Sequence, residues 1–298
     1  MRSLRFKTRL LAPPRKRLNM RKIFFLAFCL AVTGIAAHAA PASLEAPDQD
    51  SITVIKPRPK AKDEVKYETI EIKAADGTVL KADFWTPKGT ERAPAALLIH
   101  EAGADRTELR DLGDRLQKAG FAVLAPDLRG HGESIVKPED AFSAIKTDEG
   151  RAKAWAFTTR DIEAGARWLR TNRKVHSSNL NLFGVGTGSA LAVRQATRDD
   201  NVRSVTLIGP RAKMLGFDLV EDLYDLEGVP TFLIASREGK KDCAALAQCV
   251  HDELGCAPFI TVENMKAKTP ADLLADRKLS STITKPLKAI AFPKRGRR

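Results

Sequence analysis

Cysteine and histidine are scarce in this chain of 298 residues, which has four cysteines and five histidines. It has no Cys-x-x-Cys pair and no cluster of histidines, so the sequence predicts neither a metal site nor a cofactor. Three of the cysteines lie close together late in the chain, at Cys243, Cys249 and Cys256. Two interpretations of them stay open: one disulfide with a thiol left over, or small buried side chains around one helix.

Long hydrophobic runs are also missing. The apolar stretch at residues 23–35 is shorter than the roughly 20 residues that a membrane span needs. It follows the basic group Met20-Arg21-Lys22 and precedes Ala37-His38-Ala39, a small-x-small sequence typical of signal-peptide cleavage. We therefore expect residues 1–40 to hold a signal peptide that starts at Met20. The mature protein is expected to be exported, to the periplasm or outside the cell, with no membrane span after processing.

Acidic residues are scarce at both ends of the chain, and this explains its net charge of +13. Residues 1–40 hold nine basic residues and no acidic one. Four more basic residues end the chain: Lys294, Arg295, Arg297 and Arg298. Because the middle of the chain is close to neutral, no basic face is predicted, and nucleic acid is not the expected partner. A small molecule or a peptide is the expected class of ligand.

Strand-like and helix-like patterns alternate through residues 63–290, between a flexible, proline-rich leader at 41–62 and a basic tail at 291–298. Two strands joined by the turn Ala75-Asp76-Gly77 come first, and buried strands then alternate with helices. The expected strands are residues 65–72, 79–86, 95–100, 121–126, 179–183, 202–208, 231–235 and 259–262, with helices at 107–119, 162–169 and 243–254. This order predicts an α/β fold, a mostly parallel central sheet with helices on both faces. Residues 134–155 interrupt the alternation and are a candidate lid.

The most informative stretch is residues 180–192, where an apolar strand ends in three closely spaced glycines and a helix of small residues begins. This is the layout of a nucleophile elbow, the strand-turn-helix motif Gly-x-Ser-x-Gly. When Gly184 and Gly188 are aligned with the two motif glycines, Gly186 stands where the nucleophile should be. Glycine has no side chain and cannot attack a carbonyl.

Other registers of the elbow fit less well. Thr187 at the apex would put the β-branched Val185 at a position that needs a small residue, and Ser189 at the apex would put Leu191 there. Both hydroxyl residues are kept as alternative nucleophiles. A phosphate-binding glycine turn is disfavoured, because Ser189 replaces the third glycine of Gly-x-Gly-x-x-Gly.

Three segments, residues 98–103, residues 125–134 and the elbow, together resemble the α/β-hydrolase superfamily, particularly dienelactone-hydrolase-like and serine-aminopeptidase-like members. The resemblance runs from about Val65 to about Leu287. It implies that the loop holding Glu101 and Ala102 lends a backbone N–H to the oxyanion hole, with the N–H of Thr187 as the second donor. It also implies that the turn at 125–134, including His131, is structural.

A triad of this family would place its acid after the strand at 231–235, where Glu238 and Asp242 are available and Asp242 fits the spacing better. Asp242 could equally cap the helix that follows. The base belongs in the stretch 266–272, where Thr269 stands; Thr269 followed by proline is typical of a helix N-cap. No histidine occurs after His251.

Two hypotheses follow from these absences. The first is a catalytically degenerate hydrolase that keeps a ligand pocket, with Gly186, Asp242 and Thr269 as the degenerate positions. The alternative is an active carboxylic-ester or peptide hydrolase that uses Thr187 or Ser189 as an atypical nucleophile.

Overall fold

The computed structural model describes residues 66–89, 92–226, 228–235, 245–246, 267 and 269–292. The signal peptide, the leader, the three late cysteines, and the strand expected at 259–262 lie outside these residues, as do most of the basic tail and most of the helix expected at 243–254.

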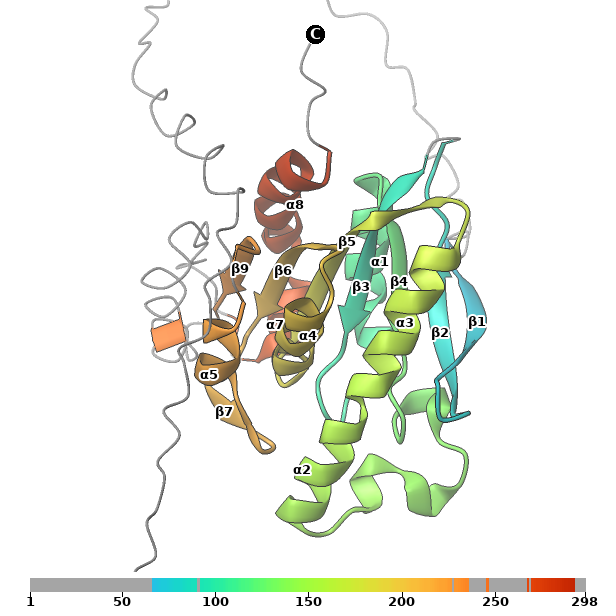
Figure 1. The fold of residues 1–298 in the computed structure, drawn as a ribbon, viewed down its shortest axis with the longest axis vertical. Helices are drawn as coiled ribbons and strands as arrows, with labels where there is room; N and C mark the ends of the chain where they lie inside the picture. The colour runs from blue at the N-terminus through green and yellow to red at the C-terminus, as the bar shows by residue number, and fades with distance from the viewer. Residues whose placement is uncertain are drawn as a thin grey trace, which may run out of the picture. The chain divides into compact units, whose positions relative to one another are not determined.

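A seven-stranded sheet forms the centre of the described domain, in the order β1-β2-β4-β3-β5-β6-β9 (Figure 1). β1 pairs with β2 and β2 with β4 in antiparallel fashion, and all later pairs are parallel, so the predicted fold class is confirmed. The strands are β1 (Glu68–Lys73), β2 (Val79–Trp85), β3 (Ala93–Ile99), β4 (Ala122–Pro126), β5 (Val175–Val185), β6 (Val202–Ile208) and β9 (Thr231–Ile234). Strands β3 and β4 are buried along their whole length, as expected when helices cover both faces.

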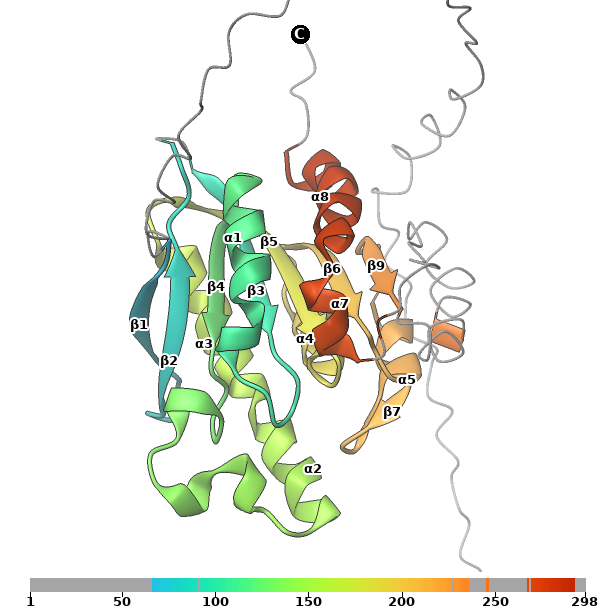
Figure 2. The same cartoon turned by 180° about the vertical axis from the view of Figure 1, so that it is seen from behind.

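Helices lie on both faces of this sheet. Figure 1 shows α3 (Thr159–Thr171) and α4 (Gly188–Arg198) in front, and Figure 2 shows α1 (Arg110–Lys118), α7 (Pro270–Ala275) and α8 (Arg277–Ala291) on the other face. A separate hydrophobic cluster fills the space under each layer, with Leu191 and Leu207 in one and Phe183 and Ile208 in the other. Among the helices of the described residues, none is long and apolar enough to cross a membrane.

Several elements differ from the sequence prediction for identifiable reasons. The helix expected at 107–119 opens as a 3₁₀ turn, η2 (Arg106–Leu109), because Asp105 accepts the backbone N–H of Thr107 and caps it. Strand β5 begins four residues earlier than expected, since its first half is polar and carries no apolar pattern. A small hairpin of β7 (Lys213–Met214) and β8 (Phe217–Asp218), followed by α5 (Leu219–Tyr224), was not predicted.

The segment between β4 and α3 forms an insertion of short helices at one end of the domain (Figure 1). Its members are η3 (Gly132–Ser134), η4 (Pro138–Asp140), η5 (Phe142–Ala144) and α2 (Asp148–Phe157). The hydroxyl of Thr147 accepts the backbone N–H of Gly150 and caps α2. This insertion corresponds to the interruption seen at residues 134–155.

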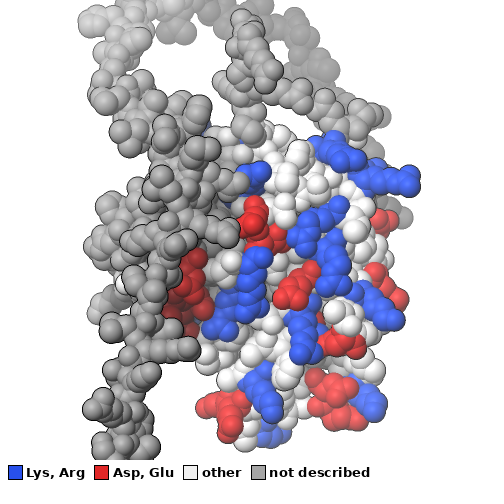
Figure 3. Space-filling view, in the orientation of Figure 1, with Lys and Arg blue, Asp and Glu red and all other residues white. Residues whose placement is uncertain are grey.

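Charged side chains of both signs alternate on the face that carries α3 and α4 (Figure 3). Ion pairs join several of them, for example Arg194 to Asp222 at 3.0 Å and Arg198 to Glu163 at 3.9 Å. This face therefore carries no extended patch of one sign.

Candidate active site

The glycines at the junction of β5 and α4 take up the geometry of a nucleophile elbow. Gly186 has a φ of +52°, the left-handed conformation that a sharp strand-to-helix turn imposes on its apex residue. A Cβ atom on Gly184 would lie 2.5 Å from the Cα of Ser189, and one on Gly188 would lie 2.6 Å from the carbonyl oxygen of His100. Both flanking positions thus exclude any side chain. These contacts support the register that places Gly186 at the apex.

The space above that apex is filled by Glu101. A Cβ atom on Gly186 would lie 1.8 Å from the Oε2 atom of Glu101 and 2.9 Å from its Cβ. The carboxyl group therefore occupies the place that the apex side chain of an elbow would take. Burial, reinforced by the nearby charge of Glu108, raises the pKa of Glu101, and Arg211 opposes this shift.

The predicted oxyanion loop meets the elbow through a single hydrogen bond. The backbone N–H of Ala102 donates to Oγ1 of Thr187, with 2.7 Å between nitrogen and oxygen. The structure thus brings these two predicted site residues together. However, the N–H of Ala102, which was expected to bind an oxyanion, already donates to the hydroxyl of Thr187. Thr187 is almost fully buried at the start of α4.

Ser189, the other candidate nucleophile, is buried inside the first turn of α4. Its hydroxyl donates to the carbonyl oxygen of Gly184 at 3.2 Å. Within the described part of the chain, neither this hydroxyl nor that of Thr187 is hydrogen-bonded to a histidine or a carboxylate.

The expected position of the catalytic base is an ordinary helix start. Thr269 accepts the backbone N–H of Asp272 through Oγ1 at 3.1 Å and donates its own N–H to Oδ2 of Asp272 at 2.9 Å. With Pro270 at the first helical position, this is a complete capping box, so the predicted N-cap is confirmed. The predicted acids Glu238 and Asp242, and also His251, lie outside the described residues.

His100, next to Glu101, is a buried structural residue. Its Nδ1–H donates to the carbonyl oxygen of Glu101 at 2.8 Å, and its Nε2 accepts the backbone N–H of Leu128 at 3.0 Å. Burial, with the neighbouring His131, lowers the pKa of His100 to about 3, so the ring is neutral. Nε2 thus holds the loop after β3 against the loop after β4, while Nδ1 fixes the ring within its own loop.

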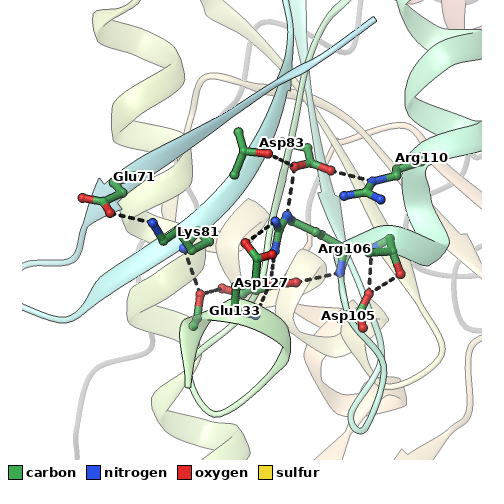
Figure 4. A network of polar contacts seen from close by, with 11 residues as sticks. Glu71, Lys81, Asp83, Asp105, Arg106, Arg110, Asp127 and Glu133 are labelled. Carbon is green, nitrogen blue, oxygen red and sulfur yellow. Dashed lines mark hydrogen bonds and ion pairs between the residues drawn. The ribbon is translucent and has the colours of Figure 1, made fainter. Parts of the chain in front are cut away.

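A buried ionic network that the sequence patterns did not predict fixes the same two loops (Figure 4). Arg106 is 3% exposed and forms ion pairs with Asp83 on β2, at 2.9 Å, with Asp127, and with Glu133 at 2.7 Å. Asp127 also accepts the backbone N–H of Arg106 at 2.8 Å. Arg110 adds a second pair to Asp83, at 2.8 Å. The available sequence signal was Asp83, a carboxylate between the apolar residues Ala82 and Phe84 of β2.

No group of three histidine, cysteine, aspartate or glutamate residues could hold a metal ion in the part of the chain for which positions are given. The site thus contains the carboxyl group of Glu101 and the hydroxyls of Thr187 and Ser189, each of which already takes part in a hydrogen bond. The backbone N–H of Ala102, the predicted oxyanion donor, is already bonded to Thr187.

Comparison with known proteins agrees with this architecture. Residues 80–212 match the dienelactone hydrolase family. The chain is 26% identical over 172 residues to the thiohydrolase aneE of Aspergillus aculeatus, a match covering 57% of this chain and 48% of that protein. It thus spans about half the length of this curated relative.

Two solved structures show the same fold. The Pyrococcus furiosus esterase Pf2001 superposes with a TM-score of 0.61 at 17% identity, covering 76% of this chain and 93% of the esterase. A dienelactone hydrolase from Anabaena variabilis gives a TM-score of 0.56 at 18% identity, covering 75% of this chain and 95% of the enzyme. The protein has the α/β-hydrolase fold. Within that fold, residues 80–212 resemble the dienelactone hydrolase family, as the three sequence segments predicted.

Proposed function

We propose that this protein is a catalytically degenerate α/β-hydrolase that binds a small molecule or a peptide at the elbow instead of hydrolysing it. The observation that carries the proposal is the carboxyl group of Glu101 above Gly186, in the place of a nucleophile side chain. A glycine at this point supplies no attacking atom.

The hydrogen bond from Ala102 to Thr187 supports the same proposal. Loss of a single oxyanion-hole donor lowers kcat by about 10²–10³-fold in enzymes that use one. Here the donor is already bound within the protein, so an ester carbonyl would have to displace the hydroxyl of Thr187 before it could be polarised.

The test uses the purified mature chain, a fluorophosphonate label and a panel of short-chain chromogenic esters. We expect no covalent adduct and no burst of product. Thr187→Ala and Ser189→Ala serve as matched variants, because each removes one candidate nucleophile. If the wild type hydrolyses an ester and either variant abolishes this with its fold intact, the proposal is wrong.

A second candidate is an active hydrolase of esters or thioesters, favoured by the similarity to a protein named as a thiohydrolase. In that case Thr187, the less buried of the two hydroxyl residues, would attack the carbonyl. A short-chain acyl thioester added to the panel distinguishes the two candidates, since only the second predicts turnover that Thr187→Ala removes.

Export completes the proposal, and its support is the signal-like sequence from Met20 to Ala39. Intact-mass measurement of the secreted or periplasmic protein should find an N-terminus at or near Ala40 or Pro41. A chain that stays in the cytoplasm and retains Phe24 and Phe25 would overturn this part.

A further inference from the structure

A cavity of about 350 Å³ lies against the helical insertion, apart from the elbow. Its walls include Val136, Phe142, Ile145 and Phe157 from the insertion, and it extends to Thr78 in the turn between β1 and β2. Val136 is 75% exposed and Phe157 is 42% exposed. Large apolar side chains that are exposed around a cavity mark a place where a ligand can bury them.

An aromatic cluster lies behind one wall of this cavity. The ring of Phe142 stacks on His131, with 4.8 Å between ring centroids, and meets Trp155 edge-on at 5.9 Å. His131 and Trp155 contact each other at 5.6 Å. His131 is 3% exposed and Trp155 is fully buried.

Each of these two buried rings carries a nitrogen without a hydrogen-bond partner among the described residues, Nε2 of His131 and Nε1 of Trp155. Nδ1 of His131 lies 2.9 Å from the carbonyl oxygen of Arg129, which can only accept, so Nδ1 carries the proton. In the neutral ring Nε2 is then an acceptor, and burial lowers the pKa of His131, which keeps the ring neutral. The indole N–H of Trp155 is a donor only.

An unpaired acceptor and an unpaired donor on two rings whose centroids lie 5.6 Å apart are complementary to a hydroxyl group, which both donates and accepts. An unsatisfied buried polar atom costs about 1–3 kcal/mol, so a ligand that satisfies both would be favoured. The ligand should be uncharged, because Arg129 is already neutralised by Asp76 at 2.8 Å and Asp161 at 2.6 Å, and Asp140, the carboxylate among the lining residues, is exposed to solvent.

We propose that this cavity binds a small alcohol with an apolar chain. The chain would pack against Ile145 and Phe157, and the ring of Phe142 would turn aside to admit the hydroxyl. The hydroxyl donates to Nε2 of His131 and accepts from Nε1 of Trp155.

The experiment titrates the full mature chain with 1-hexanol and follows the three indole N–H signals by ¹H–¹⁵N NMR. Trp85 donates to Asp114 at 2.9 Å and Trp168 packs edge-on against Phe84, so both are internal controls. The expected result is a saturable shift of the Trp155 signal alone. Methyl pentyl ether, which has the same number of heavy atoms but no donor, should bind roughly tenfold more weakly.

Two variants sharpen the test. Ala154→Phe places a ring in the cavity and should remove the 1-hexanol shift. His131→Phe removes the acceptor and should reduce the preference for the alcohol over the ether to less than twofold. The proposal is overturned by an unmoved Trp155 signal, by equal affinity for alcohol and ether in the wild type, or by a shift that persists in Ala154→Phe.

Discussion

The ionic network around Arg106 and the apex at Gly186 lie at the same end of the sheet. They differ in that the charged side chains of the network are paired, whereas the apex has no side chain. In the network, each buried carboxylate pairs with an arginine, and the loops after β3 and β4 are held together. At the apex, Gly186 has no side chain, and the carboxyl group of Glu101 lies where one would be. The framework that holds these loops together is therefore complete without a side chain at the apex.

The largest loss of stability should come from Arg106→Met, which removes the central cation of the ionic network. Asp83 and Asp127 are fully buried and would lose their shared cation. Removing one partner from a buried ion pair costs about 3–5 kcal/mol. Urea denaturation measures this loss, with Lys81→Met as the control, because the Lys81–Glu71 pair is exposed and should cost less than about 1 kcal/mol. A loss below that control value for Arg106→Met would contradict the assignment of the network as scaffold.

Two glycines of the elbow, Gly188 and Gly186, should differ in how much stability is lost when each is replaced by alanine. In Gly188→Ala the new methyl group meets two carbonyl oxygens, of His100 at 2.6 Å and Ile99 at 2.7 Å, and should cost about 3 kcal/mol. In Gly186→Ala the main obstacle is the end of the Glu101 side chain, which can move, and the left-handed backbone costs about 1–2 kcal/mol. Thermal and urea unfolding compare the variants; equal losses would argue against the elbow register.

His100 should make the scaffold sensitive to acid. Its pKa is about 3 in the folded protein against an ordinary value of 6.5, so the unfolded chain binds the proton first as the pH falls below 6.5. From pH 7 to pH 5 this lowers the free energy of unfolding by about 2 kcal/mol. In His100→Gln this part of the pH dependence should be absent, while His176→Gln, at an exposed position of β5, controls for removing a histidine. Parallel stability curves for wild type and His100→Gln between pH 5 and 7 would refute the expectation.

The smallest effect is expected from Glu101→Gln. The side chain is half-buried and fills space without bearing on the network, so stability at pH 4 should stay within about 0.5 kcal/mol of wild type. Because the pKa of Glu101 is raised in the folded protein, ionisation opposes folding as the pH rises through its ordinary value of 4.5. The variant should gain stability relative to wild type over that range, measured by urea unfolding at pH 4 and pH 7. A clear loss at pH 7 would make Glu101 part of the scaffold.

The sequence was sufficient wherever the information is local. Apolar runs located the buried strands, the glycine spacing set the elbow register, and Thr269 before proline identified a helix cap. Strand β5 began earlier than expected, since its polar first half has no apolar pattern to find.

Contacts between distant segments could not be read from such patterns. The family resemblance placed Thr187 and Ala102 at one site, but not the hydrogen bond that joins them across 85 positions. Arg106 meets Asp83 across 23 positions. Nothing in the spacing of the motif indicates that Glu101 lies over Gly186, because that follows from the paths of two separate loops. The fold was thus predictable from the chain, while the contents of the site were not.

Among the strands of the described residues, β1 is the outermost at one side of the sheet, and its composition has a consequence for solubility. Glu68, Glu71 and Lys73 are exposed along it, and Ile72 is its buried contact with the core. A strand from a second molecule that added to this edge would have to lie alongside these charges and strip them of water. Charged edge strands of this kind resist pairing between molecules. The sheet is therefore protected on this side against growth into aggregates, whatever the elbow binds.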